Sequence, residues 1–410
     1  MHNAHRPRLL VTAAAFILLL ALVALLTGAL GATGTRPGPP TATLTPSPSA
    51  TATPTARPSH TPLPPTMTPS ATATPSPTGT PTAPPPQTPL PVESPAPDAW
   101  LHRATPHYDI YYLPDSPAAH DIDTLAKLAE EAMRAATTRL QTTETTRIRI
   151  YFVNRIYYQG GASYSHNELL LSYPPPDRDY MSTDLETVLR HETAHALVEQ
   201  FLGSDRHKGG LLGEGVAVWT AGGHYQPESL APLAATLIGD NAGLYLPLPG
   251  LQRDFDNAQH EIAYLEGGAF VQFLVERWGL PKFKQYLDQP DNPQPIYRQD
   301  LAGLEQAWRT WLAAQPHTAA DSEAVRLRVR YYDLVRRYEA TLDPDARVLP
   351  GQPPSQWGLT LIGMFNHPAS APTNVALEHE FVQAGAALWS RNLTTCARLL
   401  DDLAARIPAS

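Results

Sequence analysis

The first apolar stretch of the chain runs from Leu9 to about Leu30 and is interrupted only by two threonines and one glycine. A basic segment precedes it, and its length is near the roughly 20 residues that span a bilayer. We therefore predict a signal peptide or an uncleaved signal anchor over residues 1–34. The basic flank favours an N-terminus on the inner side, which would place the rest of the chain outside the cell membrane. Secretion after cleavage is the alternative.

Residues 35–97 show almost no apolar pattern. Thr, Pro, Ser and Ala supply nearly all of this stretch, and half of the 44 prolines precede Asp98. Such a composition cannot bury enough apolar surface to offset the entropy that ordering costs. We predict a disordered tether, which in extended form would reach on the order of 200 Å.

Beyond the tether, short β-branched and aromatic runs give way to helical spacing of the apolar residues. Strands are expected at 108–112, 147–153 and 169–171, and helices at 121–140, 183–202, 212–221, 321–342, 375–388 and 394–407. Thr183 and Glu186 fit a capping box at the start of one helix, and Gly203 fits its end. The order of these elements predicts an α+β fold in which a small sheet precedes a helical half.

Composition and charge narrow the classes of function. The formal net charge is −9, and no basic stripe or nucleic-acid-binding motif occurs, so we expect no nucleic-acid partner. Cys396 is the only cysteine, which excludes an intramolecular disulfide. A lone thiol of this kind is more often a small buried apolar residue than a nucleophile.

The candidate chemistry lies in the helix expected at 183–202. His191 and His195 are four residues apart, so their imidazoles share one helical face and can reach a single metal ion. Glu192 follows His191 and can lean over the same site, where it would accept a proton from the attacking water. Such a site needs one further protein ligand and an open fourth position.

Glu214 is the candidate for the third ligand. Eighteen residues separate it from His195, which is enough for the end of the first helix, a reversing loop and the start of a second helix. Gly213 and Gly215 flank Glu214, and we expect them to let the second helix approach the first closely. The alternative is that the histidines are partly buried polar residues and that Glu214 is a solvated carboxylate at a helix start.

The pattern His191-Glu192-x-x-His195, eighteen residues and then Glu214 resembles the gluzincin zinc metallopeptidases. The likeness is greatest to the M1-aminopeptidase-like branch and its peptidase MA-like relatives, and it extends from about residue 108 to about residue 312. It implies a thermolysin-like catalytic domain with Zn²⁺ on the two histidines and Glu214. It also implies Glu192 as general base and Tyr264 as the hydroxyl that stabilises the oxyanion.

The chain departs from that family where the free amine of a substrate would bind. The aminopeptidases carry a glutamate in a strand before the zinc helix, and the equivalent stretch, 160–167, has no acidic residue. Glu168 is a possible substitute, although a solvent-facing glutamate is the plainer expectation. Backbone groups of Gly161 to Tyr164 could still pair with an extended peptide. The pattern therefore favours endopeptidase over aminopeptidase action.

Other metallopeptidase arrangements fit less well. A thermolysin-like enzyme would place an aspartate where Val218 stands, and Val198 and Phe201 occupy the positions at which a metzincin needs a glycine and a third histidine. The partners that orient the two ligand histidines are therefore open.

Several further residues are alternatives for the site. Tyr264 lies in an apolar helix and is equally well explained as a core residue. His260 precedes it by one turn and is a substitute for the oxyanion role. His207 lies in a polar loop and His224 follows two glycines, so either is an alternative metal ligand, although exposed loop histidines are common.

We divide the folded part into a metallopeptidase domain at 98–318 and a helical C-terminal region at 319–410. The helix at 321–342 carries five arginines, which we interpret as a solvated face: Arg326, Arg328, Arg330, Arg336 and Arg337. Trp357 and Trp389 are candidates to pack this region onto the catalytic half.

Together these observations predict an extracytoplasmic zinc peptidase that acts on peptides or proteins and is held at the membrane by its N-terminal segment. Two rivals remain: a catalytically inactive surface module that binds peptides in the same cleft, and a structural tether that acts as a spacer. The retention of Glu192, which a binding module would not need, counts against the first rival.

Overall fold

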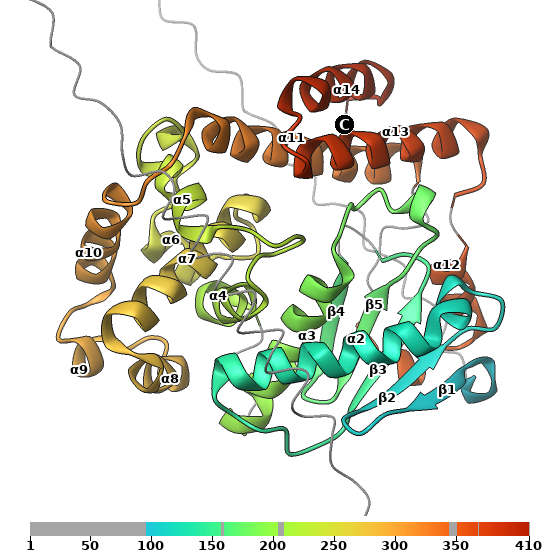
Figure 1. The fold of residues 1–410 in the computed structure, drawn as a ribbon, viewed down its shortest axis with the longest axis horizontal. Coiled ribbons are helices and arrows are strands. Elements are labelled where there is room, and N and C mark those ends of the chain that lie inside the picture. Colours follow the sequence, from blue (N-terminus) through green and yellow to red (C-terminus); the bar gives the residue numbers. More distant parts are fainter. Residues whose placement is uncertain (1–95, 157–159, 204–208, 344–350, 368, 410) are drawn as a thin grey trace, which may run out of the picture. The chain divides into compact units, whose positions relative to one another are not determined.

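The computed structural model describes residues 96–409, apart from 157–159, 204–208, 344–350 and 368 (Figure 1). The expected signal segment, the tether up to residue 95 and His207 lie outside the described residues. The described residues belong to one structural unit, residues 86–410. None of their helices is both long enough and apolar enough to span a bilayer.

Five strands form one mixed sheet in the order β1-β2-β3-β5-β4. Their bounds are β1 Leu101–Ala104, β2 Tyr108–Tyr112, β3 Ile148–Val153, β4 Gly161–Ser165 and β5 Glu168–Ser172. The two contacts of β3, with β2 and with β5, are parallel, whereas β1–β2 and β4–β5 are antiparallel. The α+β class is confirmed, and β4 is an edge strand of the described sheet.

The alternation of side chains along the strands gives the sheet two covered faces. Ile150 and Phe152 point to one face, where they join a core with apolar residues of α2 (Pro117–Leu140) and α3 (Leu185–Leu202). Figure 1 shows α2 lying across the strands. Tyr151 points to the other face, which is covered by Trp357 and α12 (Leu359–Asn366). Trp357 thus packs the C-terminal region onto the sheet, as the sequence predicted.

The strands expected at 108–112, 147–153 and 169–171 correspond to β2, β3 and β5, and the first predicted helix corresponds to α2. The predicted capping box before α3 is wrong. Asp184 is the N-cap, and its carboxylate accepts hydrogen bonds from the backbone and the hydroxyl of Thr187 at 2.9 and 2.6 Å. Glu186 instead pairs with Arg190 one turn later. Asp and Thr are both favoured at the N-cap, so the sequence alone does not decide which of the two adjacent residues caps the helix. The stop at Gly203 is confirmed, since its φ is 67°.

The helical half is centred on α4 (Gly210–Ala221) and α7 (His260–Trp278), with further helices around them: α5 Leu230–Ala235, α6 Leu248–Arg253, α8 Leu280–Asp288, α9 Gln294–Tyr297 and α10 Leu301–Ala313. A Cβ on Gly215 would lie 2.6 Å from the carbonyl oxygen of Gly267. Gly215 therefore permits a close approach of α4 to α7. The expectation that it serves contact with α3 is wrong, because Gly215 faces the other neighbour of α4.

The C-terminal region forms α11 (Ala319–Leu342), α13 (Pro372–Trp389) and α14 (Leu393–Arg406), close to the helices predicted there. Their apolar residues, including the buried Cys396, form a second core. Trp389 packs against this core while remaining partly exposed. Tyr180, Met181 and Tyr225 also belong to it, so it joins the C-terminal helices to segments flanking α3 and α4.

Two of the five arginines on α11 do not lie on a solvated face. Arg328 is buried and pairs with Glu228, and Arg336 pairs with the buried Glu261 at the start of α7. The prediction of a solvated face is wrong for these two, because their partners come from distant segments. The prediction of a solvated face holds for Arg326, which pairs with Glu323 on the same helix and is about half exposed.

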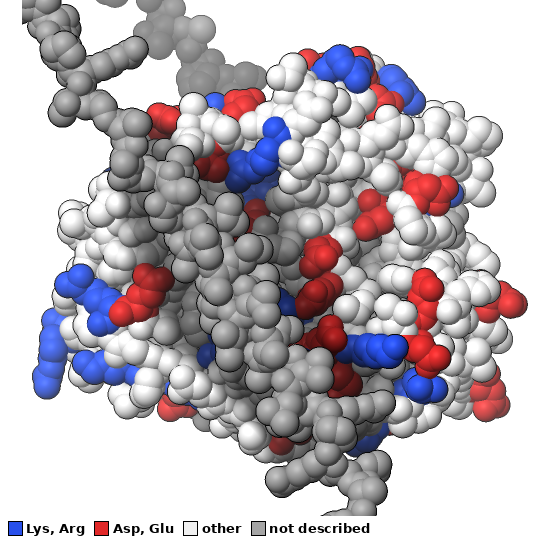
Figure 2. Space-filling model, in the orientation of Figure 1, with Lys and Arg blue, Asp and Glu red and all other residues white. Residues whose placement is uncertain are grey.

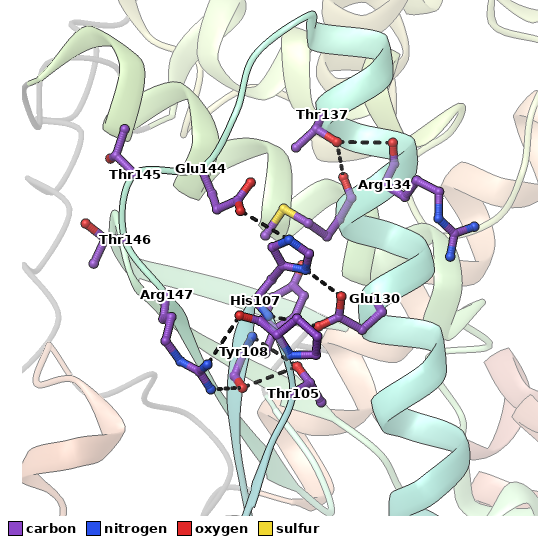
Figure 3. A network of polar contacts seen from close by, with 12 residues as sticks. Thr105, His107, Tyr108, Glu130, Arg134, Thr137, Glu144, Thr145, Thr146 and Arg147 are labelled. Carbon is purple, nitrogen blue, oxygen red and sulfur yellow. Dashed lines mark hydrogen bonds and ion pairs between the residues drawn. The ribbon is translucent and has the colours of Figure 1, made fainter.

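A polar network fixes the start of β2 against α2 and β3 (Figure 3). The backbone N–H of His107 donates to Glu130 Oε1 at 3.0 Å, and its ring nitrogens lie 2.5 Å from Glu130 and 3.1 Å from Glu144. Arg147 donates to the carbonyl of Tyr108 at 2.7 Å and pairs with Asp109. The network holds the N-terminal end of β2, whose first residue, Tyr108, contacts Thr193 of α3.

Candidate metal centre

Two consecutive helices bring the three candidate ligands to one point. His191 and His195 lie one turn apart on α3, and Glu214 lies in the second turn of α4. The two imidazole Nε2 atoms are 3.1 Å apart, and each is 3.3 Å from Glu214 Oε2. The three atoms therefore form a nearly equilateral triangle that is almost completely shielded from solvent.

This geometry suits a tetrahedral metal ion. Zinc bonds of roughly 2.0–2.1 Å at tetrahedral angles place neighbouring ligand atoms about 3.3 Å apart. Hydrogen bonds can account for at most two of these three contacts, since each imidazole has one Nε2 proton to donate, whereas one ion serves all three. His191, His195 and Glu214 thus form a group that can hold a metal ion. Two imidazoles and one carboxylate are a donor set that suits zinc and leaves one position open.

The charges around the site also favour a cation. Burial by itself lowers the pKa of His195, yet Glu214 and two further glutamates raise it to about 9. Burial by itself raises the pKa of Glu214, yet His195 and His191 hold it well below 4.5. The field that draws a proton to His195 would equally stabilise a divalent ion.

Glu192 lies beside the triangle and is not one of its corners. Its side chain is buried, and both it and the three candidate ligands line a cavity of about 210 Å³. Burial raises the pKa of Glu192 above 4.5, and the two histidines oppose this effect. Strand β4 packs directly on it, since a Cβ on Gly161 would lie 2.8 Å from Glu192 Oε1. Glu192 therefore lies between strand β4 and the three candidate ligands.

Helix α3, which carries the two candidate ligand histidines, is anchored to the sheet from its centre. The hydroxyl groups of Thr193 and Tyr108 are 2.8 Å apart, and both residues are fully buried. Thr193 lies between the two histidines, so this contact fixes the turn that carries them. Among the described residues, His191 Nδ1 is buried without a hydrogen-bond partner. The oxygen that usually orients such an imidazole is therefore not found for His191.

Aromatic side chains form another part of the cavity wall. Tyr264 and His260 come from α7, and His224 follows α4. The ring of His224 stacks on that of Tyr264, with centroids 3.9 Å apart. His260 Nε2 lies 3.1 Å from the hydroxyl of Tyr225. Burial and the nearby carboxylate of Glu214 raise the pKa of Tyr264 well above 10, so its hydroxyl keeps its proton and remains a donor.

The structure thus brings together His191, Glu192, His195, Glu214 and Tyr264, the five site residues that the sequence predicted. His224 and His260 line the same cavity but lie outside the metal-binding group. His207 lies outside the described residues.

Both expectations for Glu168 are wrong: it is neither a substitute amine-binding residue in the cavity nor a solvent-facing glutamate. It does not line the cavity, and it is only 2% exposed. Its carboxylate pairs with Arg149 at 2.8 Å and accepts a hydrogen bond from the backbone of Ser355 at 2.8 Å. A long-range partner from the C-terminal region explains its burial, which a local strand pattern could not foresee.

Sequence reasoning missed two residues of the cavity wall. Glu199 lies one turn after His195 on the same helical face, so the four-residue spacing that identified the histidines could have identified it too. Tyr225 also lines the cavity and is buried against His224 and His260. No spacing in the sequence indicates this role, because it depends on the packing of α4, α7 and α11.

The surface is acidic near the middle of one face. Figure 2 shows acidic side chains in a row there, whereas basic side chains lie mostly toward the margins of the visible described residues. This arrangement agrees with the net charge of −9.

Comparison of the chain with protein-family models, with curated proteins and with solved structures finds no match.

Proposed function

We propose that the protein is a zinc-dependent peptidase with a thermolysin-like catalytic domain of the gluzincin type. One observation carries the proposal: His191, His195 and Glu214 converge with separations of 3.1–3.3 Å beside the buried carboxylate of Glu192. Two imidazoles, one carboxylate and an adjacent base form the set of groups that metal-assisted hydrolysis requires.

Zinc held by these three residues would supply Lewis-acid chemistry, which polarises a carbonyl oxygen and lowers the pKa of a water molecule. Glu192 accepts the proton of the attacking water and passes it to the amine that leaves when the peptide bond breaks. Its burial favours the protonated form after the first step, which assists the transfer to the leaving group.

Tyr264 is the candidate for stabilising the oxyanion of the tetrahedral intermediate. It faces the same cavity as Glu192, and its raised pKa keeps the hydroxyl protonated at neutral pH. A donor held by a rigid helix stabilises developing negative charge without reorganisation. His260, the alternative for this role, lies 3.1 Å from Tyr225 through Nε2, which makes it a poorer donor to a substrate.

Endopeptidase action is better supported than aminopeptidase action. Strand β4 contributes Gly161, Ala162 and Ser163 to the cavity wall and no carboxylate that would bind a free amine. Glu168, the nearest acidic residue after β4, is engaged elsewhere. An edge strand beside the site can instead align an extended peptide through its backbone.

The proposed setting is the outer side of a cell membrane, with the domain held on its Thr/Pro-rich tether. This part of the proposal rests on the apolar segment Leu9–Leu30 and on the composition of 35–97. Substrates would then be extracytoplasmic peptides or proteins.

Metal content tests the site. We expect one zinc ion per full-length chain and its loss in the His191→Ala variant, since two ligands hold zinc weakly. His120→Ala is the matched control, because His120 is exposed on α2. Elemental analysis after zinc reconstitution measures the result. A wild-type chain that binds no metal would contradict the proposal and favour a peptide-binding or spacing module.

Measurements of peptide cleavage test whether Glu192 acts as the general base. We expect Glu192→Gln to retain zinc and to lose at least about 100-fold in kcat/KM on a peptide library, because the amide cannot accept the proton. The exposed Glu131→Gln on α2 should behave like wild type. If the zinc-loaded wild type cleaves no peptide, the cleft is a binding module. If Glu192→Gln cleaves at the wild-type rate, the mechanism is wrong.

A further inference from the structure

His224 occupies a position in the cavity that the proposed mechanism does not use. It follows Gly222 and Gly223 at the end of α4, where the chain turns sharply. A Cβ on Gly223 would lie 1.9 Å from the carbonyl oxygen of Gln226, so this turn requires glycine. The turn directs His224 into the cavity wall, where its ring centroid is 5.5 Å from that of His191.

The imidazole is clamped between two aromatic rings. Tyr225 stacks on one side with a centroid separation of 3.9 Å and an angle of 27°, and Tyr264 stacks on the other at 3.9 Å and 18°. Two parallel contacts of this kind fix the plane of the ring and leave its edge as the reactive surface. The clamp therefore orients His224 before any ligand arrives.

The clamp is itself held by the C-terminal region. The ring of Tyr225 packs against that of Tyr332 on α11 at 4.6 Å, and the hydroxyl of Tyr332 donates to the carbonyl of Met181 at 3.1 Å. On the other side, Tyr264 belongs to α7, whose second residue, Glu261, pairs with Arg336 of α11. Helix α11 thus supports both halves of the clamp.

The polar edge of His224 is not used within the described residues. Neither ring nitrogen has a hydrogen-bond partner there, and the ring borders the cavity. His260 differs, since its Nε2 lies 3.1 Å from the hydroxyl of Tyr225. A polar group that is held rigidly by stacked rings at the wall of a cavity, with no partner among the described residues, is oriented in advance to bind a ligand.

We propose that His224 is a further catalytic residue, which donates its ring N–H to an oxygen of the ligand that binds beside His191. The inference rests on the proposed metal site and deepens it, since it assigns a second hydrogen-bond donor on the same side as Tyr264. The ligand class is a carbonyl or carboxylate compound whose oxygen lies near the open position of the metal group.

The test replaces His224 by Phe, which keeps a flat ring in the clamp and removes both nitrogens. The probe is acetohydroxamate, a small compound with a carbonyl oxygen that binds zinc, titrated calorimetrically into zinc-loaded full-length protein. We expect His224→Phe to keep one zinc ion and to weaken acetohydroxamate binding by about tenfold, as the loss of one hydrogen bond predicts. On a cleaved peptide, kcat/KM should fall at least as far. His224→Gln, whose amide can donate, should recover part of both losses.

The outcomes separate this inference from the peptidase proposal. A wild type that binds zinc and cleaves no peptide would refute the peptidase proposal. The affinity for acetohydroxamate would still test the role of His224. Equal affinities for wild type and His224→Phe would overturn the inference and leave His224 as packing. Loss of zinc in both His224 variants would also overturn it, by making the residue part of the metal group. The exposed His120→Phe serves as the control.

Discussion

Gly161 shows how much the candidate site depends on single residues. Strand β4 passes so close to α3 that a Cβ at this position would meet Glu192 at 2.8 Å and Leu171 at 2.9 Å. The absence of a side chain therefore determines where the Glu192 carboxylate can lie. The spacing of His191, Glu192 and His195 made it predictable that these residues lie close together on α3. The contact with Gly161 was not predictable, because it joins a strand to a helix.

We predict that Gly161→Ala retains zinc and loses roughly 10- to 100-fold in kcat, because the added methyl group displaces Glu192 by a fraction of an ångström or more. Zinc analysis and steady-state kinetics measure the two effects. Gly243→Ala is the control, since no atom lies within 4 Å of its Cβ position. An unchanged kcat would show that the position of Glu192 tolerates such a shift.

Glu266 is a buried carboxyl group on α7 that takes no part in the cavity. It is fully buried, and one oxygen accepts a hydrogen bond from the backbone of Leu246 at 2.9 Å. Burial raises its pKa well above the usual 4.5, although the Leu246 N–H opposes this. The folded state therefore holds a proton that the unfolded state has lost above about pH 4.5. It follows that this group lowers the stability as the pH rises through that window.

We predict that Glu266→Gln gains stability relative to wild type as the pH rises from 5 to 8, by up to about 1.4 kcal/mol per pH unit. The amide keeps the acceptor for Leu246 and cannot ionise. Urea unfolding at pH 5, 6.5 and 8 measures the difference, with the exposed Glu131→Gln as control. Parallel pH profiles of wild type and Glu266→Gln would show that Glu266 does not titrate in this range.

At the scale of elements, periodic apolar patterns were sufficient to predict a helix or strand where only one side of the segment packs against the core. Strands β2, β3 and β5 and helices α2, α11 and α13 follow the predicted ranges within a few residues. Strand β1 was missed because all four of its residues are exposed and show no alternation. The short helices α8 and α9 were missed because proline-rich surroundings obscure the pattern. The start of α3 was misplaced by one residue, since Thr183 and Asp184 are both good caps.

At the scale of the whole molecule, the C-terminal helices support the site through contacts that no local pattern encodes. Arg328 donates to the carbonyl of Glu261 at 3.2 Å, and Arg336 pairs with the carboxylate of the same residue. Glu261 lies beside His260 at the start of α7. These partners are more than sixty positions apart in the sequence, which is why a solvated face was expected for the arginines.

We predict that Arg336→Met lowers the free energy of unfolding by about 3 kcal/mol, because it leaves the buried carboxylate of Glu261 without its cation. The double variant Arg336→Met, Glu261→Met should recover much of this loss. Arg398→Met is the control, and since its pair with Asp402 on the same helix is exposed we expect a change below about 1 kcal/mol. Urea unfolding measures the wild type, Arg336→Met, Glu261→Met, the double variant and the control. An additive double variant would show that the two residues do not interact.

The position of β4 at the edge of the described sheet bears on whether the chain's own Thr/Pro-rich segment could bind beside it. An edge strand captures an extended segment through backbone N–H and C=O groups, and proline has no N–H to offer. Half of the 44 prolines lie ahead of Asp98, so the protein's own Thr/Pro-rich segment lacks donors at close intervals. A cleft that recognises backbone in this way would pass over that segment. If the proposed peptidase is held on this segment, the spacing of the prolines would protect its own attachment from cleavage.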